Sequence, residues 1–186
     1  MAWETVSTKR LFEHPHHLPI VEDRVRLPDG SEVDWLRYGD ERDGYRVVES
    51  VTAICQRGDG RVLVGWQWCH GPQRDVDEFP GGAADVGESP EHAVRRELKE
   101  EVGVEARHLA GLGSYLWSNR RYPGVFHVFL ATDLVLGEPS PEPGEDVRLE
   151  WWLPGDIDEG LRSGRLQNMS TLASWALFRA RNPGAI

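Results

Sequence analysis

The stretch from Gly82 to Val104, GAADVGESPEHAVRRELKEEVGV, constrains the fold more than any other part of the chain. Ser89 is a residue type that caps helix N-termini, and Pro90 suits the first helical position, where a backbone N–H has no helical partner. Gly103 suits the left-handed residue just beyond a helix end. The stretch therefore predicts a loop followed by a helix that begins at Pro90 and ends before Gly103.

The predicted helix carries three glutamates, Glu97, Glu100 and Glu101, on one face. At about 100° per residue, the other two lie about 60° and 40° to either side of Glu97, so the acidic arc borders the apolar stripe instead of opposing it. That stripe consists of Val94, Leu98 and Val102. Like charges at this spacing repel by about a few tenths of a kcal/mol per pair, so stability does not explain them. Clustered carboxylates suit Mg²⁺ or Mn²⁺, although a solvated Glu-rich helix has the same pattern.

The net charge of −10 over 186 residues argues against a protein that binds nucleic acid through a basic surface. An anionic ligand would then need a bound divalent cation to attract it. The apolar runs are far shorter than a membrane span, and the N-terminal MAWETVSTKRLFEHPHH lacks the apolar core of a signal peptide. Cys55 and Cys69 have no CxxC spacing, so we expect reduced cysteines, the first in a strand and the second in a loop. These features predict a cytoplasmic protein without nucleic-acid or membrane partners.

Residues 1–46 are expected to form an N-terminal extension of antiparallel strands, and residues 47–186 the main domain. The extension contains a predicted hairpin, Val21–Leu27 and Ser31–Leu36, around the turn Pro28-Asp29-Gly30. A lone hairpin is marginally stable in water. We therefore expect it to pair with the main domain or with another subunit.

The main domain begins with two predicted strands, Val47–Ile54 and Arg61–Gln67, paired as a hairpin through Gly58-Asp59-Gly60. Gly71–Asp77 is expected to be a loop that leads to the consecutive Gly81 and Gly82. Further strands are expected over Leu109–Leu116, Val125–Val135 and Val147–Leu153, and helices over Asp156–Ser163 and Ser170–Ala180.

Gly82, five residues, Glu88, seven residues and then RELKEEVGV over 96–104 resemble the complete Nudix box. The resemblance implies an α/β (α+β) fold, the Nudix α/β/α sandwich with a mixed sheet, to which the N-terminal strands are an extension. It also implies an enzyme, a hydrolase that acts on phosphoanhydride bonds. The products would be two monophosphates.

The same resemblance implies roles for individual residues of the box. Glu97 and Glu101 would bind a divalent metal, Mg²⁺ or alternatively Mn²⁺, and Glu100 would join them as a ligand or assist catalysis. The backbone carbonyl of Gly81 would be a further ligand. Arg96 would orient the glutamates through an ion pair.

The flanking sequence resembles the ADP-ribose pyrophosphatase branch of the Nudix hydrolases. The resemblance rests on Glu78-Phe79-Pro80-Gly81-Gly82, Tyr122-Pro123-Gly124, the strand Val125–Asp133 and Glu145–Glu150. It implies ADP-ribose or a related nucleoside diphosphate sugar as the substrate. It also implies a homodimer whose N-terminal strands exchange between subunits, which would provide the hairpin with a partner.

Two segments depart from that branch. Relatives usually have Gln-Tyr-Arg after the first hairpin, where this chain has Gln67-Trp68-Cys69-His70 and no arginine. The general base of the branch is a loop glutamate, and here Glu145 is the first candidate and Glu142 the second, with a solvated loop as the alternative. Substrate contacts are expected from Trp68, His70, Glu78 and Tyr122.

Two other functions stay open. One, motivated by the missing arginine, is a pyrophosphohydrolase that acts on oxidised nucleoside triphosphates. The other is a non-catalytic module that senses a nucleotide sugar, although such regulators usually carry a basic helix-turn-helix domain, which this sequence does not offer.

Overall fold

A computed structural model describes residues 3–14, 17–39, 48–118, 120–122, 124–140 and 147–182. The chain divides into two compact units, the first made of Met1–Val48 with Leu116–Val125 and the second of Glu49–Tyr115 with Phe126–Ile186. The first unit thus includes a segment far along the chain in addition to the N-terminal strands. The functional division at residues 46 and 47 stays a prediction.

The first unit contains a three-stranded antiparallel sheet in the order β1-β2-β3. Its strands are β1 (Glu4–His14), β2 (His17–Arg26) and β3 (Glu32–Tyr38). The predicted hairpin is confirmed: Arg26 pairs with Glu32, and the turn between them contains Gly30 at a φ of 84°, which favours glycine. The third strand, β1, was not predicted, and it pairs along β2.

One ion pair is buried inside this unit. The Arg37 guanidinium donates to the Asp23 carboxylate over an Nε–Oδ2 distance of 2.5 Å, and the Thr8 hydroxyl donates to the same carboxylate at 2.6 Å. The side chains of Arg37 and Asp23 are only 4% and 0% exposed. A carboxylate taken out of water this completely needs such partners, because an unpaired buried charge is very costly.

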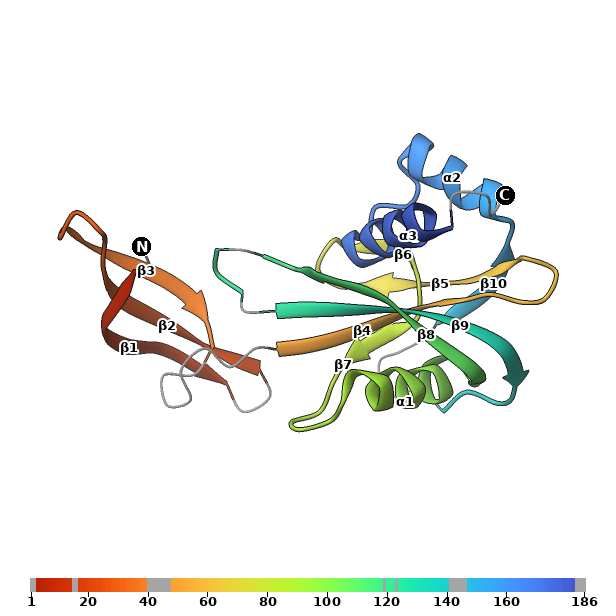
Figure 1. Ribbon diagram of the computed structural model, residues 1–186, viewed down its shortest axis with the longest axis horizontal. Helices are drawn as coiled ribbons and strands as arrows, with labels where there is room; N and C mark the ends of the chain where they lie inside the picture. The colour runs from red at the N-terminus through yellow and green to blue at the C-terminus, as the bar shows by residue number, and fades with distance from the viewer. Residues whose placement is uncertain are drawn as a thin grey trace. The chain divides into compact units, whose positions relative to one another are not determined.

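The second unit places helices on both sides of its strands (Figure 1). One sheet has the order β7-β4-β9-β8 and the other the order β10-β5-β6. The strands are β4 (Val48–Cys55), β5 (Val62–Cys69), β6 (Arg74–Glu78), β7 (Gly81–Ala83), β8 (Val104–Leu116), β9 (Gly124–Leu136) and β10 (Arg148–Trp152). The helices are α1 (Pro90–Val102), α2 (Pro154–Ser163) and α3 (Met169–Arg181). No helix among the described residues combines the length and apolarity that a membrane crossing requires.

Alternating side chains on the strands supply two separate cores. On β4, Ala53 packs in the cluster that contains α1, whereas the neighbouring Ile54 packs in the cluster that contains α2 and α3. Successive side chains of a strand point to opposite faces, so one strand can serve both cores. The fold is therefore the predicted sandwich of strands between helices.

The helix α1 follows the sequence signals closely. The Ser89 hydroxyl accepts a hydrogen bond from the backbone N–H of His92, and Gly103 has a φ of 65° with its N–H bonded to the carbonyl of Leu98. Val94 and Leu98 are fully buried. The predicted cap, stop and apolar stripe are confirmed.

Three local predictions for the second unit are wrong. β4 and β5 belong to different sheets, and within the described part of the chain an isolated bridge joins Gln56, just after β4, to Val62 next to the predicted turn. Gly71–Asp77 is not entirely loop, because β6 pairs with β5 there. Cys69 consequently lies at the end of a strand, and it is a free cysteine like Cys55.

Candidate active site

The guanidinium of Arg96 binds three carboxylates, two on helix α1 and one in the loop that precedes it. Its Nη1 donates to Glu97 at 3.0 Å and to Glu100 at 3.1 Å. Its Nε and Nη2 donate to the two oxygens of Glu88 at 3.2 and 2.9 Å, and Nη2 also donates to the carbonyl of Ala83 at 3.0 Å. These contacts raise the pKa of Arg96, with Glu88 as the largest cause. The predicted ion pair between Arg96 and the glutamates is present, and it extends to the loop.

Glu88 connects the loop to the helix. Its side chain is 9% exposed, accepts a hydrogen bond from the Asp85 N–H at 3.0 Å and lies 2.8 Å from His92 Nδ1. Hydrogen bonds from Arg96, and then from the Asp85 amide, lower its pKa to about 2. Glu88 therefore stays ionised and holds the loop against α1.

Glu101 and Glu97 meet the two consecutive glycines. The Gly81 N–H donates to the Glu101 carboxylate at 3.0 Å, and Glu101 is only 9% exposed. A Cβ on Gly81 would lie 2.1 Å from the Val51 carbonyl, and a Cβ on Gly82 would lie 2.4 Å from Glu97 Oε1. Any larger residue at either glycine would push strand β4 or a box glutamate away.

The donor set fits a hard divalent cation in its chemistry. It consists of carboxylate oxygens: three carboxylates bond to the Arg96 guanidinium and Glu101 bonds to the Gly81 N–H, so carboxylates outnumber the cation in these contacts. Among the described residues, no three acidic, histidine or cysteine side chains converge closely enough to hold an ion as they stand. Glu97 and Glu100 instead face Arg96, so ligation would require these side chains to turn.

Glu78 ends β6 just before the glycines. Its two oxygens accept hydrogen bonds from Gln67 Nε2 at 3.0 Å and from Asn168 Nδ2 at 2.9 Å. Burial raises the pKa of its carboxyl group, and the hydrogen bond from Gln67 partly opposes this rise. Glu78 therefore links three elements, β5, β6 and the start of α3, in addition to its predicted role in substrate binding.

The other predicted substrate contacts are distributed over both units. Trp68 is 58% exposed near the end of β5, and His70 follows in a turn where its carbonyl accepts from the Gln73 side chain at 2.6 Å. Tyr122 belongs to the first unit, where it packs against Tyr38 at a ring separation of 6.0 Å. Burial raises the pKa of Tyr122. Glu142, Glu145 and Pro123 lie outside the described residues.

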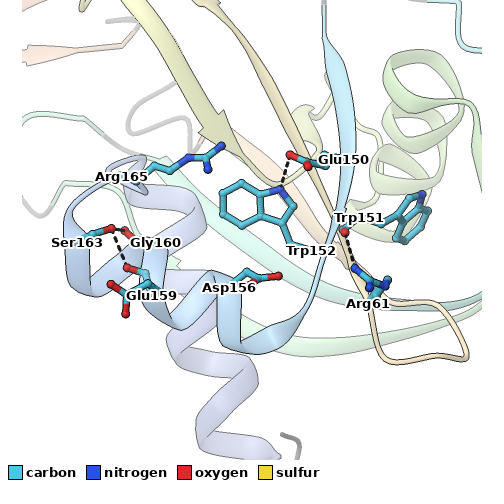
Figure 2. A pocket seen from close by; sticks show the side chains of 9 residues that line it. All are labelled: Arg61, Glu150, Trp151, Trp152, Asp156, Glu159, Gly160, Ser163 and Arg165. Atoms are coloured by element: carbon cyan, nitrogen blue, oxygen red, sulfur yellow. Dashed lines mark hydrogen bonds between the residues drawn. The ribbon is translucent and has the colours of Figure 1, made fainter.

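A pocket of about 360 Å³ lies beside β10 and α2, and Figure 2 shows the side chains that line it. Its polar groups already have partners: Trp152 Nε1 donates to Glu150 at 2.9 Å, and the Arg165 guanidinium lies 4.3 Å from the centre of the Trp152 ring. None of the box glutamates lines this pocket. The volume alone therefore does not mark the chemical site.

The sequence pattern does not reveal several contacts that shape the site. No sequence motif marks the Ala83 carbonyl, which accepts from Arg96. The same is true of the Asn168 and Thr171 side chains, which bond to Glu78 and to the Phe79 N–H. Asn168 has one local signal, since it is a good N-cap residue ahead of an apolar helix. That signal predicts a helix start and says nothing of a partner about 90 residues away.

Comparison with known proteins agrees with this geometry. A NUDIX domain model matches residues 47–172. The ADP-ribose pyrophosphatase of Bacillus subtilis is 28% identical over 147 residues, which cover 79% of this chain and 75% of that protein. The ADP-ribose pyrophosphatase of Mycobacterium tuberculosis is 27% identical over 184 residues, covering 97% and 83%.

A solved structure of an ADP compounds hydrolase has the same fold, with a TM-score of 0.87 over 100% of this chain and 98% of the other, at 18% identity. The matched family region spans well over half of the chain and contains the glycines, the glutamates and the arginine described above. This chain therefore belongs to the Nudix family of hydrolases, enzymes that act on phosphoanhydride bonds.

Proposed function

We propose that this protein is a Mg²⁺-dependent pyrophosphohydrolase that cleaves the diphosphate of ADP-ribose or a related nucleoside diphosphate sugar into two monophosphates. The observation that carries the proposal is the cluster of four carboxylates around Arg96 and the Gly81 amide. The two ADP-ribose pyrophosphatases among the relatives support the choice of substrate.

Hydrogen bonds within the protein would orient the proposed metal ligands. The Gly81 N–H orients one oxygen of Glu101, and Arg96 keeps Glu97 and Glu100 together despite their mutual repulsion. Glu97, Glu100, Glu101 and the Gly81 carbonyl are the proposed ligands. A bound Mg²⁺ supplies charge neutralisation for the diphosphate and lowers the pKa of the attacking water.

We also propose roles in substrate binding and in proton transfer for residues that the sequence pointed to. Trp68 is exposed enough for its indole to stack on a base, as aromatic rings do. His70, Glu78 and Tyr122 are the other proposed substrate contacts. Glu145, or alternatively Glu142, is the proposed general base, which must reach the attacking water. We further propose a cytoplasmic homodimer formed through residues 1–46.

A substrate panel tests the reaction. With Mg²⁺ and ADP-ribose the purified protein is expected to release AMP and ribose 5-phosphate, and a chelator is expected to stop the release. Mn²⁺ in place of Mg²⁺ shows which cation supports turnover better. Failure to cleave ADP-ribose and every other nucleoside diphosphate sugar would refute the proposal, and a higher kcat/KM for oxidised nucleoside triphosphates would favour that alternative.

The assembly has its own test. Analytical ultracentrifugation of the full chain is expected to give the mass of a dimer, and deletion of the first N-terminal strand, β1, is expected to shift the protein toward monomer. A monomeric full-length protein at micromolar concentration would contradict the dimer, but it would leave the proposed reaction standing.

A further inference from the structure

The segment between α2 and α3 fastens strand β6 along its length. Arg74 donates to Gln167, Arg165 donates to Asp77 at 2.9 Å, Asn168 donates to Glu78 at 2.9 Å, and the Phe79 N–H donates to the Thr171 hydroxyl at 3.0 Å. These partners are about 90 residues apart in the sequence. Together these four links form a clamp, which we define as residues 165–171.

The clamp is exposed at one end and buried at the other. Arg74 and Gln167 are exposed, whereas Thr171 is 0% exposed and Phe79 is packed against Trp175 in the core at a ring separation of 6.1 Å. A hydrogen bond made in the interior cannot be replaced by water when one partner is removed. The buried end therefore constrains the backbone most strongly, and that end is the one next to the glycines.

A stiff path of two residues connects the buried end of the clamp to the Gly81 N–H. After Phe79, the ring of Pro80 fixes its own φ, and the Pro80 carbonyl accepts a hydrogen bond from the Ala53 N–H at 2.9 Å. The next residue is Gly81, whose N–H holds the Glu101 carboxylate. A shift of Phe79 would thus reach Glu101 with little room for relaxation.

We propose that Asn168 and Thr171 are positioning residues for the metal site. By holding Glu78 and Phe79, they set the place of the Gly81 N–H and so the orientation of the Glu101 carboxylate. Their described bonds across to strand β6 and its end run to Glu78 and Phe79, which are not proposed ligands. The inference rests on the proposed function, because it assigns Glu101 to a bound cation, and it extends that function to the N-terminus of α3.

The competing explanation is that these contacts only cap and pack α3. The Asn168 side chain does cap the helix, since its Oδ1 accepts from the Thr171 N–H at 3.2 Å. The two roles use different atoms, because the cap uses Oδ1 whereas the bond to Glu78 uses Nδ2. A substitution that keeps the cap but removes the amide donor can therefore separate them.

The variants follow from that chemistry. Thr171→Val keeps the shape of the side chain and removes the hydroxyl, and Thr171→Ser restores a hydroxyl. Asn168→Ser retains a good N-cap and removes the donor to Glu78. Gln167→Ala is the matched control, because it breaks the exposed end of the same clamp. Circular dichroism and thermal unfolding show which variants are folded.

The first measurement is Mn²⁺ binding to the substrate-free protein, by electron paramagnetic resonance. Loss of a residue that supports a metal ligand typically weakens metal binding by about 10- to 100-fold, so we expect a loss in this range for Thr171→Val and about tenfold for Asn168→Ser. Thr171→Ser and Gln167→Ala are expected to stay within about threefold of wild type. Hydrogen exchange of the metal-free protein adds a second measurement, in which the Gly81 amide is expected to exchange faster in Thr171→Val.

The outcomes distinguish a failure of the positioning role from a failure of the proposed function. If folded Thr171→Val and Asn168→Ser bind Mn²⁺ like wild type and keep the Gly81 amide protected, the positioning role is overturned while the proposed function stands. If Thr171→Val does not fold, Asn168→Ser decides by the same criteria. A wild-type protein that binds no Mn²⁺ would overturn the proposed function, and this inference with it.

Discussion

Two arginines of this protein bind carboxylates in opposite ways. Arg37 pairs with Asp23 in the interior of the first unit, where both side chains are almost fully buried. Arg96 meets Glu88, Glu97 and Glu100 at the edge of α1, partly exposed, and so leaves negative charge in excess.

The difference indicates different tasks. A buried pair of opposite charges is shielded from a ligand in solution, and breaking it leaves a charge without this partner in the interior. An unbalanced cluster is poorly suited to stability, because its members repel one another, but it attracts a cation. We therefore expect substitutions at Arg37 and Asp23 to change stability, and substitutions around Arg96 to change activity.

The largest expected effect is on the buried pair. Asp23→Asn removes the charge that compensates Arg37, and removal of one partner of a buried pair typically costs about 3–5 kcal/mol. Urea unfolding measures the loss, and kcat of the fraction that remains folded is expected to be unchanged. Asp34→Asn, at an exposed salt bridge of the same unit, is the control and should change the free energy of unfolding by less than about 1 kcal/mol. Equal losses in the free energy of unfolding for both variants would contradict the expected difference between a buried and an exposed ion pair.

Next in size is the loss of a proposed metal ligand. Glu101→Gln keeps the shape of the side chain but removes its charge, so we expect kcat to fall by about 100-fold or more while the protein stays folded. Steady-state kinetics with ADP-ribose and Mg²⁺ measure it. Glu105→Gln, an exposed neighbour that pairs with Lys99, serves as the matched control. Near-normal turnover in Glu101→Gln would reject the assignment of Glu101 as a ligand.

A smaller effect is expected when Arg96 becomes lysine. An ammonium group keeps the charge but cannot contact three carboxylates and the Ala83 carbonyl from one planar fork. We expect kcat/KM to fall by about tenfold. Arg95→Lys changes the adjacent arginine, which binds the Ala106 carbonyl and Glu91, and should have a much smaller effect on activity. If the two lysine variants had the same activity, Arg96 would not organise the glutamates.

The smallest expected effect is a dependence of stability on pH. The pKa of Glu88 is lowered in the folded protein to about 2 from an ordinary value of 4.5, so its ionised form is favoured by folding. This contribution is fully present above pH 4.5 and is lost as the pH falls toward 2. Wild type is therefore expected to lose stability over this window relative to Glu88→Gln, as urea unfolding at each pH would measure. A parallel pH profile for both proteins would exclude the linkage.

The local signals of the sequence predict some elements well and others poorly. Helix α1 and its acidic face follow from the cap, the stop and the spacing of Glu97, Glu100 and Glu101, all of which act within one helix. Strand β6 was missed because its charged sequence, RDVDE, has no apolar alternation. It is held instead by β5 on one side and by the clamp on the other.

The turn at Gly58-Asp59-Gly60 shows a different limit. Turn residues indicate that the chain reverses, and the Gly60 N–H does bond back to the Arg57 carbonyl at 2.9 Å. They do not determine whether the flanking strands stay paired beyond the first bridge. Here β4 joins β7 and β9, whereas β5 joins β6 and β10.

The sequence by itself determined the identity of the charged groups, their order on one helical face, and the two glycines that let β7 approach β4 and the α1 glutamate Glu97 closely. These properties are local, because helical periodicity and the space that a Cβ occupies act over a few residues. The tertiary structure decided that Glu101 lies against the Gly81 amide and that Asn168 and Thr171 hold the strand before it. Those contacts join segments 20 to 92 residues apart, so only the packing of α1 and α3 on the strands brings them together.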